Sequence, residues 1–314
     1  IKSIREDLTK FKVIFDNWFF ESSLGKLSDK KSEISKALAK LQKDHAYEKN
    51  GAIWLESSKF GDDKDRVIIR EDGRGTYLSA DLAYHRNKLD RGFDTIINVW
   101  GADHHGYIKR IEATIEAMGY SKKQMQVQLV QFANLFENGS KVKMSTRSGN
   151  FYTLKQLIDD IGPDASRFYY LSKQADQHLD FDIGIARSNS KDNLYYYIQY
   201  AHARISSVEK KFLELGHSLP SKFNDVDFDD CDELLQMALS AQFVIRSSGE
   251  SLQPHLIVYY LRDIAQNFHQ FYNNVNILNA DEKDKNNIMR TLMIVKSVIA
   301  SSMQLLGIEP LENM

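Results

Sequence analysis

The chain has 314 residues, enough for two domains of ordinary size. Hydrophobic residues make up 42% and charged residues 27%, as in an ordinary globular protein, and the net charge of −2 excludes a global attraction to nucleic acid or to a membrane surface. The single cysteine, Cys231, excludes an internal disulfide and a cysteine-rich zinc site, so we expect a cytoplasmic protein without a bound metal. No apolar run approaches the roughly 18 residues of a membrane span and no signal peptide opens the chain, so no membrane partner is expected.

Residues 26–66 predict a small α+β insertion. Ser28 or Asp29 can cap a helix whose apolar residues share one face. The dipeptide Asn50-Gly51 then separates two short apolar segments and favours the tight turn of a β-hairpin.

From residue 67 the pattern changes to that of a parallel α/β sheet. Residues 67–69 predict a short buried strand and residues 77–88 a helix. The near-continuous apolar run at 95–100 is typical of a strand covered on both faces. A helix at 108–118 and a strand at 126–136 follow, which gives one βαβ unit.

After about residue 152 the pattern becomes all-helical. Six apolar residues step by four, three, four, three and four positions along one face of a long helix: Leu194, Ile198, Ala201, Ile205, Val208 and Phe212. Residues 257–271 and 288–306 have the same periodicity. We therefore expect a connecting helical segment at 153–188 and a helical bundle at 189–314.

The first candidate site is the turn at residues 98–107 (NVWGADHHGY), where a strand ends and a helix begins. Ligands of parallel sheets bind at this end of a strand, Gly101 allows close approach to the backbone, and a helix N-terminus favours anions. Asp103 can accept a hydrogen bond from a ribose hydroxyl. A plain strand–helix turn with capping or solvated histidines fits the pattern equally well. A zinc site is disfavoured because His104 and His105 lack the further ligands that a metal needs.

The second candidate is the loop at residues 139–149 (GSKVKMSTRSG). There is no acidic residue between Glu137 and Asp159, whereas lysine, arginine and hydroxyl side chains are frequent. Such a loop suits a polyphosphate that gains charge in its transition state. Composition alone favours the alternative of a solvated basic loop.

Two further candidates combine aromatic and charged residues on helices. Tyr77 and Asp81 share one helix face, and a carboxylate beside a phenol ring suits a guanidinium group. The alternative for this pair is a helix-start charge with a core tyrosine. Tyr197, Tyr200 and Arg204 form a stripe that suits stacking on unpaired RNA bases, although tyrosines half-buried in the bundle explain the spacing equally well.

Taken in chain order, these segments resemble the arginyl-tRNA synthetase family of class I. The matching stretches are FDNWFFESSL at 15–24, FGDDKDRV at 60–67, TYLSADLAYH at 76–85, GADHHGY at 101–107, KMSTRSG at 143–149 and YAHARI at 200–205. The resemblance implies an α/β fold at residues 1–152, the C-terminal half of a doubly wound parallel sheet with the insertion at 26–66. It also implies that the all-α bundle at 189–314 is an anticodon-binding domain.

The resemblance further implies roles for individual residues. The arginine guanidinium would contact Tyr77, Asp81 and His104. ATP, with Mg2+ as its complex, would contact Gly101, Asp103, His105, Lys143, Met144 and Ser145. The catalytic signature loop would contribute Lys143, Ser145 and Thr146. The anticodon loop of tRNA(Arg) would contact Tyr197, Tyr200, Arg204 and Met314. The implied reaction is ATP-dependent activation of arginine and its transfer to the 3′ end of tRNA(Arg).

Two departures from the family pattern matter. The signature loop has Thr146 where the usual sequence has a second lysine, a change that many members of the family share. The first class I signature, His-x-Gly-His, does not occur in the sequence, and the chain begins with Ile1 rather than Met. We therefore expect a fragment that lacks the N-terminal part of a monomeric parent enzyme and is inactive in isolation. The alternative is a non-catalytic tRNA-binding protein derived from such a synthetase.

Overall fold

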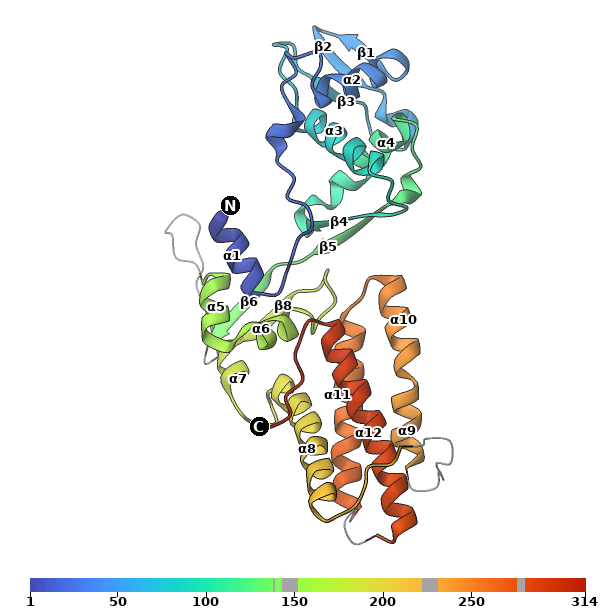
Figure 1. Cartoon of the computed structure of the whole chain (residues 1–314). Coiled ribbons are helices and arrows are strands. Elements are labelled where there is room, and N and C mark those ends of the chain that lie inside the picture. Colours follow the sequence, from blue (N-terminus) through green and yellow to red (C-terminus); the bar gives the residue numbers. More distant parts are fainter. Residues whose placement is uncertain (138, 143–151, 222–230, 276–279) are drawn as a thin grey trace. The chain divides into compact units, whose positions relative to one another are not determined.

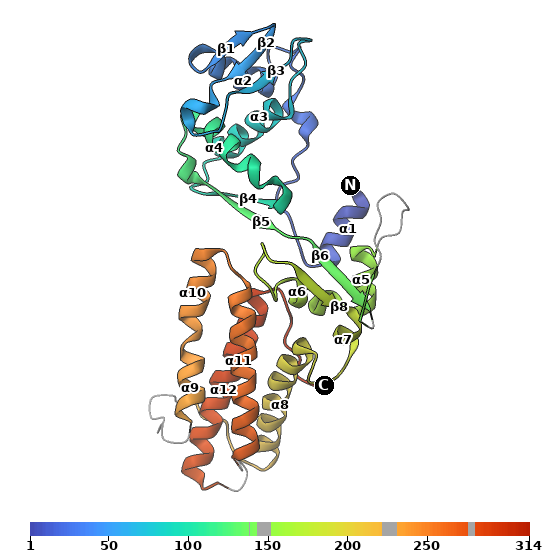
Figure 2. The same ribbon diagram turned by 180° about the vertical axis from the view of Figure 1, so that it is seen from behind.

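The fold is given by a computed structural model of the chain, shown in Figure 1 and from behind in Figure 2. The described residues are all except 138, 143–151, 222–230 and 276–279. They divide into two compact units. The cleft unit, named after the cleft described below, consists of residues 15–132, and the bundle unit combines residues 1–14 with residues 133–314.

A helix and an antiparallel sheet form the first part of the cleft unit. After the short turn η1 (Glu21–Leu24), the elements are α2 (Glu33–Asp44), β1 (Ala46–Lys49), β2 (Ala52–Leu55), η2 (Ser57–Phe60) and β3 (Arg66–Ile69). The strands pair in the order β1-β2-β3. Asn50 and Gly51 both have positive φ angles, 52° and 71°, as the tight turn between β1 and β2 requires. The predicted hairpin is confirmed.

Helix α2 begins later than the sequence analysis predicts. Residues 27–31 lie before the helix, which begins at Glu33, so neither Ser28 nor Asp29 caps it. Instead Ser32 accepts a hydrogen bond from the backbone N–H of Ser35 at 3.1 Å. The local sequence offers several polar cap candidates, and spacing alone did not distinguish Ser32 from Ser28 or Asp29.

A parallel β–α–β unit forms the second part of the cleft unit. Its elements are α3 (Tyr77–Asp90), β4 (Ile96–Gly101), η3 (Ala102–Tyr107), α4 (Ile108–Ala117), η4 (Lys122–Gln124) and β5 (Met125–Val130). Strands β4 and β5 pair in parallel, from Ile96 opposite Met125 to Gly101 opposite Val130. This confirms the predicted βαβ unit and places the turn at 101–107 at the carboxyl end of β4.

Two details of this region correct the sequence-based prediction. Strand β4 is covered on one face only, since Ile97 and Val99 are 46% and 67% exposed whereas Asn98 between them is buried. The apolar run hid this alternation because its exposed residues are as hydrophobic as core residues. The predicted strand at 126–136 is two strands: β5 ends at Val130, and the residues from 133 onward pair in a different sheet.

The bundle unit begins with a small α/β part. Its elements are α1 (Lys2–Lys10), β6 (Ala133–Glu137), β7 (Ser140–Lys141), α5 (Leu154–Ile161), α6 (Pro163–Tyr170), β8 (Leu179–Asp182) and α7 (Ile183–Arg187). Strand β6 pairs in parallel with β8 and antiparallel with β7. The region after residue 152 is therefore not all-helical as predicted. In β8 only Leu179 and Phe181 are buried, and a four-residue alternation is too short to recognise by periodicity.

Arg167 of α6 holds two distant segments of the bundle unit together. Its Nε donates to the backbone carbonyl of Leu306 at 2.9 Å, and its Nη1 donates to that of Phe11 at 3.0 Å. The guanidinium also lies over the Phe11 ring, 5.5 Å from the centroid. Gly307 has a positive φ of 73°, which favours glycine, and a Cβ there would lie 2.7 Å from Arg167 Nε and would displace the guanidinium from these contacts.

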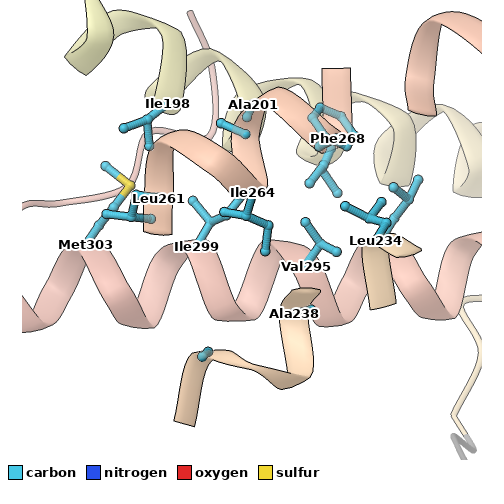
Figure 3. Packing of buried hydrophobic residues seen from close by; sticks show 14 of the residues in the cluster. Ile198, Ala201, Leu234, Ala238, Leu261, Ile264, Phe268, Val295, Ile299 and Met303 are labelled. Carbon is cyan, nitrogen blue, oxygen red and sulfur yellow. The ribbon is translucent and has the colours of Figure 1, made fainter. Parts of the chain in front are cut away.

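Long helices complete the bundle unit: α8 (Leu194–Glu214), α9 (Asp232–Leu239), α10 (Ala241–Ser251), α11 (His255–Asn274) and α12 (Glu282–Leu305). Figure 3 shows side chains of α8, α9, α11 and α12 pointing into a common core. Ile198 and Ala201, from the apolar stripe predicted for residues 194–212, are buried there. The predicted helical bundle is confirmed.

Helix α12 carries a long apolar stretch. Among the described residues, only 284–305 are long and apolar enough to cross a membrane, which corrects the expectation that no run approaches such a span. Packing gives another explanation, because Leu292, Val295 and Ile299 are buried in the core shared with α8 and α11. A core helix of a soluble bundle meets the same criteria of length and composition, so the stretch is weak evidence for a membrane segment.

Helix α5 begins with a capping box that offers a test of local stability. The backbone N–H of Gln156 donates to Thr153 Oγ1 at 3.1 Å, and the Gln156 side chain accepts from the Thr153 backbone N–H at 2.8 Å. We expect Thr153→Ala to lower the free energy of unfolding by about 1 kcal/mol. Chemical denaturation measures this change. Thr153→Ser keeps the hydroxyl and is the control; an equal loss in both variants would contradict the capping role.

Candidate functional site

An open cleft of about 1140 Å³ lies within the cleft unit. Residues of β3, α3, β4, η3 and α4 line it, so the insertion and the parallel part both contribute. Four residues that the sequence analysis selected are among them: Tyr77, Asp81, Gly101 and His104. The structure thus brings the predicted guanidinium-binding residues together with the turn at the end of β4.

Two hydroxyl groups anchor the start of α3 to β3. Thr76 Oγ1 donates to the backbone carbonyl of Val67 at 2.9 Å, and Ser79 Oγ donates to that of Ile68. Between them, Tyr77 lines the cleft and is 85% exposed. This exposure excludes the alternative of a core tyrosine and leaves the ring available for stacking on a flat cation.

Asp81 is half-buried, and Tyr107 holds one of its oxygens. The phenol of Tyr107 donates to Asp81 Oδ2 at 2.6 Å, and the guanidinium of Arg110 lies over the phenol ring, 4.7 Å from its centroid. Burial and the hydrogen bond to Asp81 both raise the pKa of Tyr107, so the phenol stays protonated at neutral pH. No group in the described part of the chain hydrogen-bonds to Asp81 Oδ1, and Asp81 lines the cleft, so this oxygen is the acceptor that the residue can offer to a ligand.

The turn after β4 exposes two polar side chains next to Gly101. A Cβ on Gly101 would lie 2.5 Å from Asp103 Oδ1, so a larger residue at this position would displace the exposed Asp103 carboxylate. His104 Nε2 lies 3.7 Å from Asp103 Oδ2, and the side chains of Asp103 and His104 are 64% and 62% exposed. Asp103 and His105 are not among the residues that line the cleft. The turn therefore offers His104 to the cleft and Asp103 to the solvent beside it.

A polar network that the sequence analysis missed joins α3 to β4. His85 Nδ1 lies 2.8 Å from the backbone oxygen of Asp81, and His85 Nε2 lies 3.1 Å from Asn98 Nδ2. Lys88 Nζ donates to Asn98 Oδ1 at 2.6 Å. Because a carbonyl only accepts, His85 carries its proton on Nδ1 and accepts from Asn98 on Nε2. His85, Asn98 and Lys88 all line the cleft.

Burial sets the charge states within this network. It lowers the pKa of His85 to about 4, an effect that the charge of Lys88 reinforces, so the imidazole is neutral at pH 7. Burial likewise lowers the pKa of Lys88 to about 8. The sequence did contain a signal for this network, because Tyr77, Asp81, His85 and Lys88 step by four, four and three positions along one helix face.

A second arrangement that the sequence analysis missed fixes Arg66 in the lining of the cleft. Asp62 accepts two hydrogen bonds from Arg66, at 2.8 Å from Nε and 2.7 Å from Nη2. The Asp62 side chain is only 1% exposed. Its burial acts to raise the pKa of Asp62, but the hydrogen bonds from Arg66 and from the backbone outweigh burial, and the pKa is lowered. The pair thus fixes the Arg66 guanidinium in the lining of the cleft, with its charge balanced by Asp62.

The predicted RNA-binding stripe on α8 is assembled with residues of α11. The Arg204 guanidinium lies over the rings of Tyr272 and Tyr200, 3.7 Å and 5.5 Å from their centroids. The Tyr200 ring also stacks on the imidazole of His269, with 5.5 Å between the ring centroids. The centroid of the Tyr197 ring lies 4.6 Å from that of the same imidazole. Tyr200 is 40% exposed, so this aromatic–arginine cluster reaches the surface.

The C-terminal tail that ends at Met314 is attached to α8 through Leu311. The backbone N–H of Leu311 donates to Gln199 Oε1 at 2.9 Å, and His202 Nδ1 lies 2.8 Å from the Leu311 oxygen. Gln199 and His202 each lie two positions from a residue of the stripe, which at about 100° per residue puts them on the other side of α8. Met314 is 51% exposed at the end of this tail.

The signature-loop residues Lys143, Met144, Ser145 and Thr146 lie outside the described residues. Strand β7 with Lys141 precedes this loop, and Lys141 is exposed. Within the part of the chain that the structure describes, no group of three or more His, Cys, Asp or Glu side chains could hold a metal ion.

Comparison with known families divides the chain in two. Residues 5–181 match the catalytic domain of tRNA synthetases class I (R), and residues 198–314 match the DALR anticodon binding domain. The first match alone covers more than half of the chain.

Individual relatives agree with this assignment. The arginine–tRNA ligases of Syntrophotalea carbinolica and Bacillus subtilis are each 41% identical to the chain, over 99% and 100% of its length. The chain spans 56% of the length of each of these two relatives.

Solved structures show the same fold. A Campylobacter jejuni protein assigned as an arginyl-tRNA synthetase is 37% identical and superposes with a TM-score of 0.86, over 99% of this chain and 67% of that one. The arginyl-tRNA synthetase of Thermus thermophilus, at 18% identity and a TM-score of 0.81 over 98% of this chain and 62% of that one, shares the fold. The family matches and the cleft geometry lead to one conclusion: the chain belongs to the arginine family of class I tRNA synthetases.

Proposed function

We propose that the full-length protein containing this chain is an arginine–tRNA ligase. In the first step a carboxylate oxygen of arginine attacks the α-phosphorus of ATP, arginyl-adenylate forms and pyrophosphate leaves. In the second step a hydroxyl at the 3′ end of tRNA(Arg) attacks the adenylate carbonyl and AMP leaves. Both steps depend on positioning and on stabilising charge at the phosphates.

The observation that carries this proposal is the pairing of Asp81 with Tyr77 in one cleft. Asp81 Oδ1 can accept from a guanidinium, while Tyr107 keeps the carboxylate oriented through Oδ2. The exposed ring of Tyr77 offers a face on which the flat guanidinium can stack. His104, from the turn after β4, is proposed to complete the arginine pocket.

ATP is proposed to bind along the turn after β4. Gly101 lets a ligand approach the backbone, and the exposed Asp103 can accept from a ribose hydroxyl. His105 is proposed as a further ATP contact. Lys143, Met144, Ser145 and Thr146 are proposed to act on the phosphates, where a lysine and hydroxyl donors would stabilise developing charge. Mg2+ enters this proposal only as the ATP complex and supplies charge neutralisation there.

The bundle is proposed to bind tRNA(Arg) through the cluster around Arg204. Stacked tyrosines with an arginine suit unpaired bases of an anticodon loop. Met314 is retained as a proposed contact on the tail, separate from this cluster. We further propose the domain limits 1–152, 153–188 and 189–314, a cytoplasmic location and a monomeric parent enzyme.

The test of this function is arginine- and tRNA-dependent exchange between ATP and pyrophosphate by the full-length protein. Arginine should support exchange, whereas lysine and cysteine should not. Exchange with another amino acid, or none with arginine and tRNA(Arg) present, would refute the proposal. A purely tRNA-binding protein would bind tRNA without exchange, but it would have no use for the carboxylate and phenol in the cleft.

Arg204 provides a test of the tRNA-binding face. We expect Arg204→Gln to weaken the binding of tRNA(Arg) by about 1–3 kcal/mol, because the substitution removes the cation held between two tyrosine rings. A fluorescence titration at fixed salt concentration measures the change. Arg246→Gln removes an exposed arginine from α10 and serves as the control. If both variants bind tRNA equally well, the face is wrongly assigned.

A further inference from the structure

Lys88 places a half-buried ammonium group in the cleft that is proposed to bind a cationic amino acid. Its Nζ donates to Asn98 Oδ1 at 2.6 Å and lies 4.5 Å from the centre of the Tyr84 ring. The same Nζ of Lys88 also lies 3.4 Å from His85 Nε2. These contacts hold the ammonium in the lining of the cleft, so a second cation in the cleft would bind near it.

Asp81 is the group that favours the charge of Lys88. The two residues are seven positions apart on α3, hence two turns apart on the same face. Burial has the largest effect on the pKa of Lys88 and lowers it. The negative charge of Asp81 raises this pKa, and the positive charge of Arg91 lowers it. A guanidinium bound to Asp81 would cancel that support and add a positive charge to the cleft.

We propose that Lys88 is a proton-releasing residue of the arginine pocket, whose ammonium gives one proton to solvent when a guanidinium binds to Asp81. This inference rests on the proposed arginine-binding function. The N–H bond of the ammonium breaks, a neutral amine remains hydrogen-bonded to Asn98, and water or buffer takes the proton. Lys88 is thus a residue that tunes substrate binding, and the chemical step does not use it.

The other groups that face Lys88 do not replace it in this role. On α3, His85 is neutral because burial lowers its pKa to about 4. From the turn η3, Tyr107 stays protonated because burial raises its pKa, and His104 is the same in every Lys88 variant, so it cannot cause a difference between them. The remaining charged groups of the lining are guanidinium groups, which do not lose protons near neutral pH: Arg66, Arg70 and Arg110.

The sign of the pH dependence follows from the pKa of Lys88. That pKa is about 8 in the free cleft, and loss of support from Asp81 lowers it further in the complex. The ligand therefore prefers the deprotonated lysine, and the affinity for arginine rises with pH below about 8, by up to tenfold per pH unit, and levels off above it.

The test is calorimetry of arginine binding to the full-length protein at several pH values, in buffers with different ionisation enthalpies. The wild type should release up to one proton per arginine between pH 7 and 8. Lys88→Gln has no proton to lose and should bind arginine with little pH dependence in this range. Lys88→Arg keeps a permanent charge and should bind weakly at every pH. Lys122→Gln, an exposed lysine of the same unit, should behave like the wild type.

The outcomes separate this inference from the proposed function. Arginine binding without proton release, or with the same release in Lys88→Gln, would overturn the inference and leave the function intact. No arginine binding by the wild type would refute both. The α-amino group of arginine titrates equally in every variant, so a difference between variants reports Lys88. Circular dichroism of each variant confirms that it is folded.

Discussion

Replacing Asp81 by asparagine in the full-length protein is expected to weaken arginine binding by about 1.5–3 kcal/mol, the scale of a hydrogen bond to a charged group. This corresponds to a roughly 10- to 150-fold higher Kd. Asparagine keeps the size of the side chain and can still accept from Tyr107, which donates to Asp81 at 2.6 Å. It removes the negative charge, and when its oxygen accepts from Tyr107 its NH2 group, a donor, replaces the acceptor Oδ1 that faces the guanidinium. Calorimetric titration with arginine measures the effect.

The control for this substitution is Asp63→Asn. The Asp63 side chain is 76% exposed and pairs with Lys109 at 3.4 Å, so its loss removes a carboxylate from the same unit without altering the cleft lining. We expect this variant to bind arginine like the wild type. Unchanged affinity in Asp81→Asn, or an equal loss in both variants, would count against the pocket.

The largest effect on stability is expected from Phe268→Ala in α11. Phe268 is 0% exposed and lies in the core between α8, α9, α11 and α12 (Figure 3). Removing a buried phenyl ring loses its transfer free energy and leaves a cavity, which together lower the free energy of unfolding by about 3–5 kcal/mol. Chemical denaturation, followed by the helical signal in circular dichroism, measures this decrease in the free energy of unfolding.

Phe243 of α10 supplies the matched control. It is the same residue type on a neighbouring helix but is 68% exposed, so Phe243→Ala leaves no cavity. The free energy of unfolding should change by less than about 1 kcal/mol in this variant. Equal losses in the two variants would show that the core described here does not hold the bundle together.

The sequence predicted long elements well because their periodicity extends over many residues. The apolar stripe of α8 repeats across about five helical turns. Such a long pattern defines the buried face of the helix before any packing partner is known. Strand β8 has four residues, and its register with β6 comes from pairing with a segment more than 40 residues away. A local pattern holds no information on that partner.

The candidate site was predictable in part for a related reason. Tyr77 and Asp81 share a helix face, and the turn after β4 follows a strand end, so both could be selected from spacing and chemistry. Their meeting in one cleft depends on how α3 packs against β4. Asn98 opens the candidate segment at 98–107, but its role was not predicted, because it lies in an apolar strand and only its contacts with His85 and Lys88 reveal that role.

The amino-acid sequence by itself determined the helical faces, the hairpin turn and the family, because these depend on residue order and spacing. Only the tertiary structure decided which face of β4 is covered, where the tail after α12 attaches, and which charges share the cleft. The charges in the cleft depend on the tertiary structure because burial changes the pKa of the side chains that line it. The same lysine in water would keep its ordinary pKa, whereas beside Asn98 and His85 its pKa is about 8.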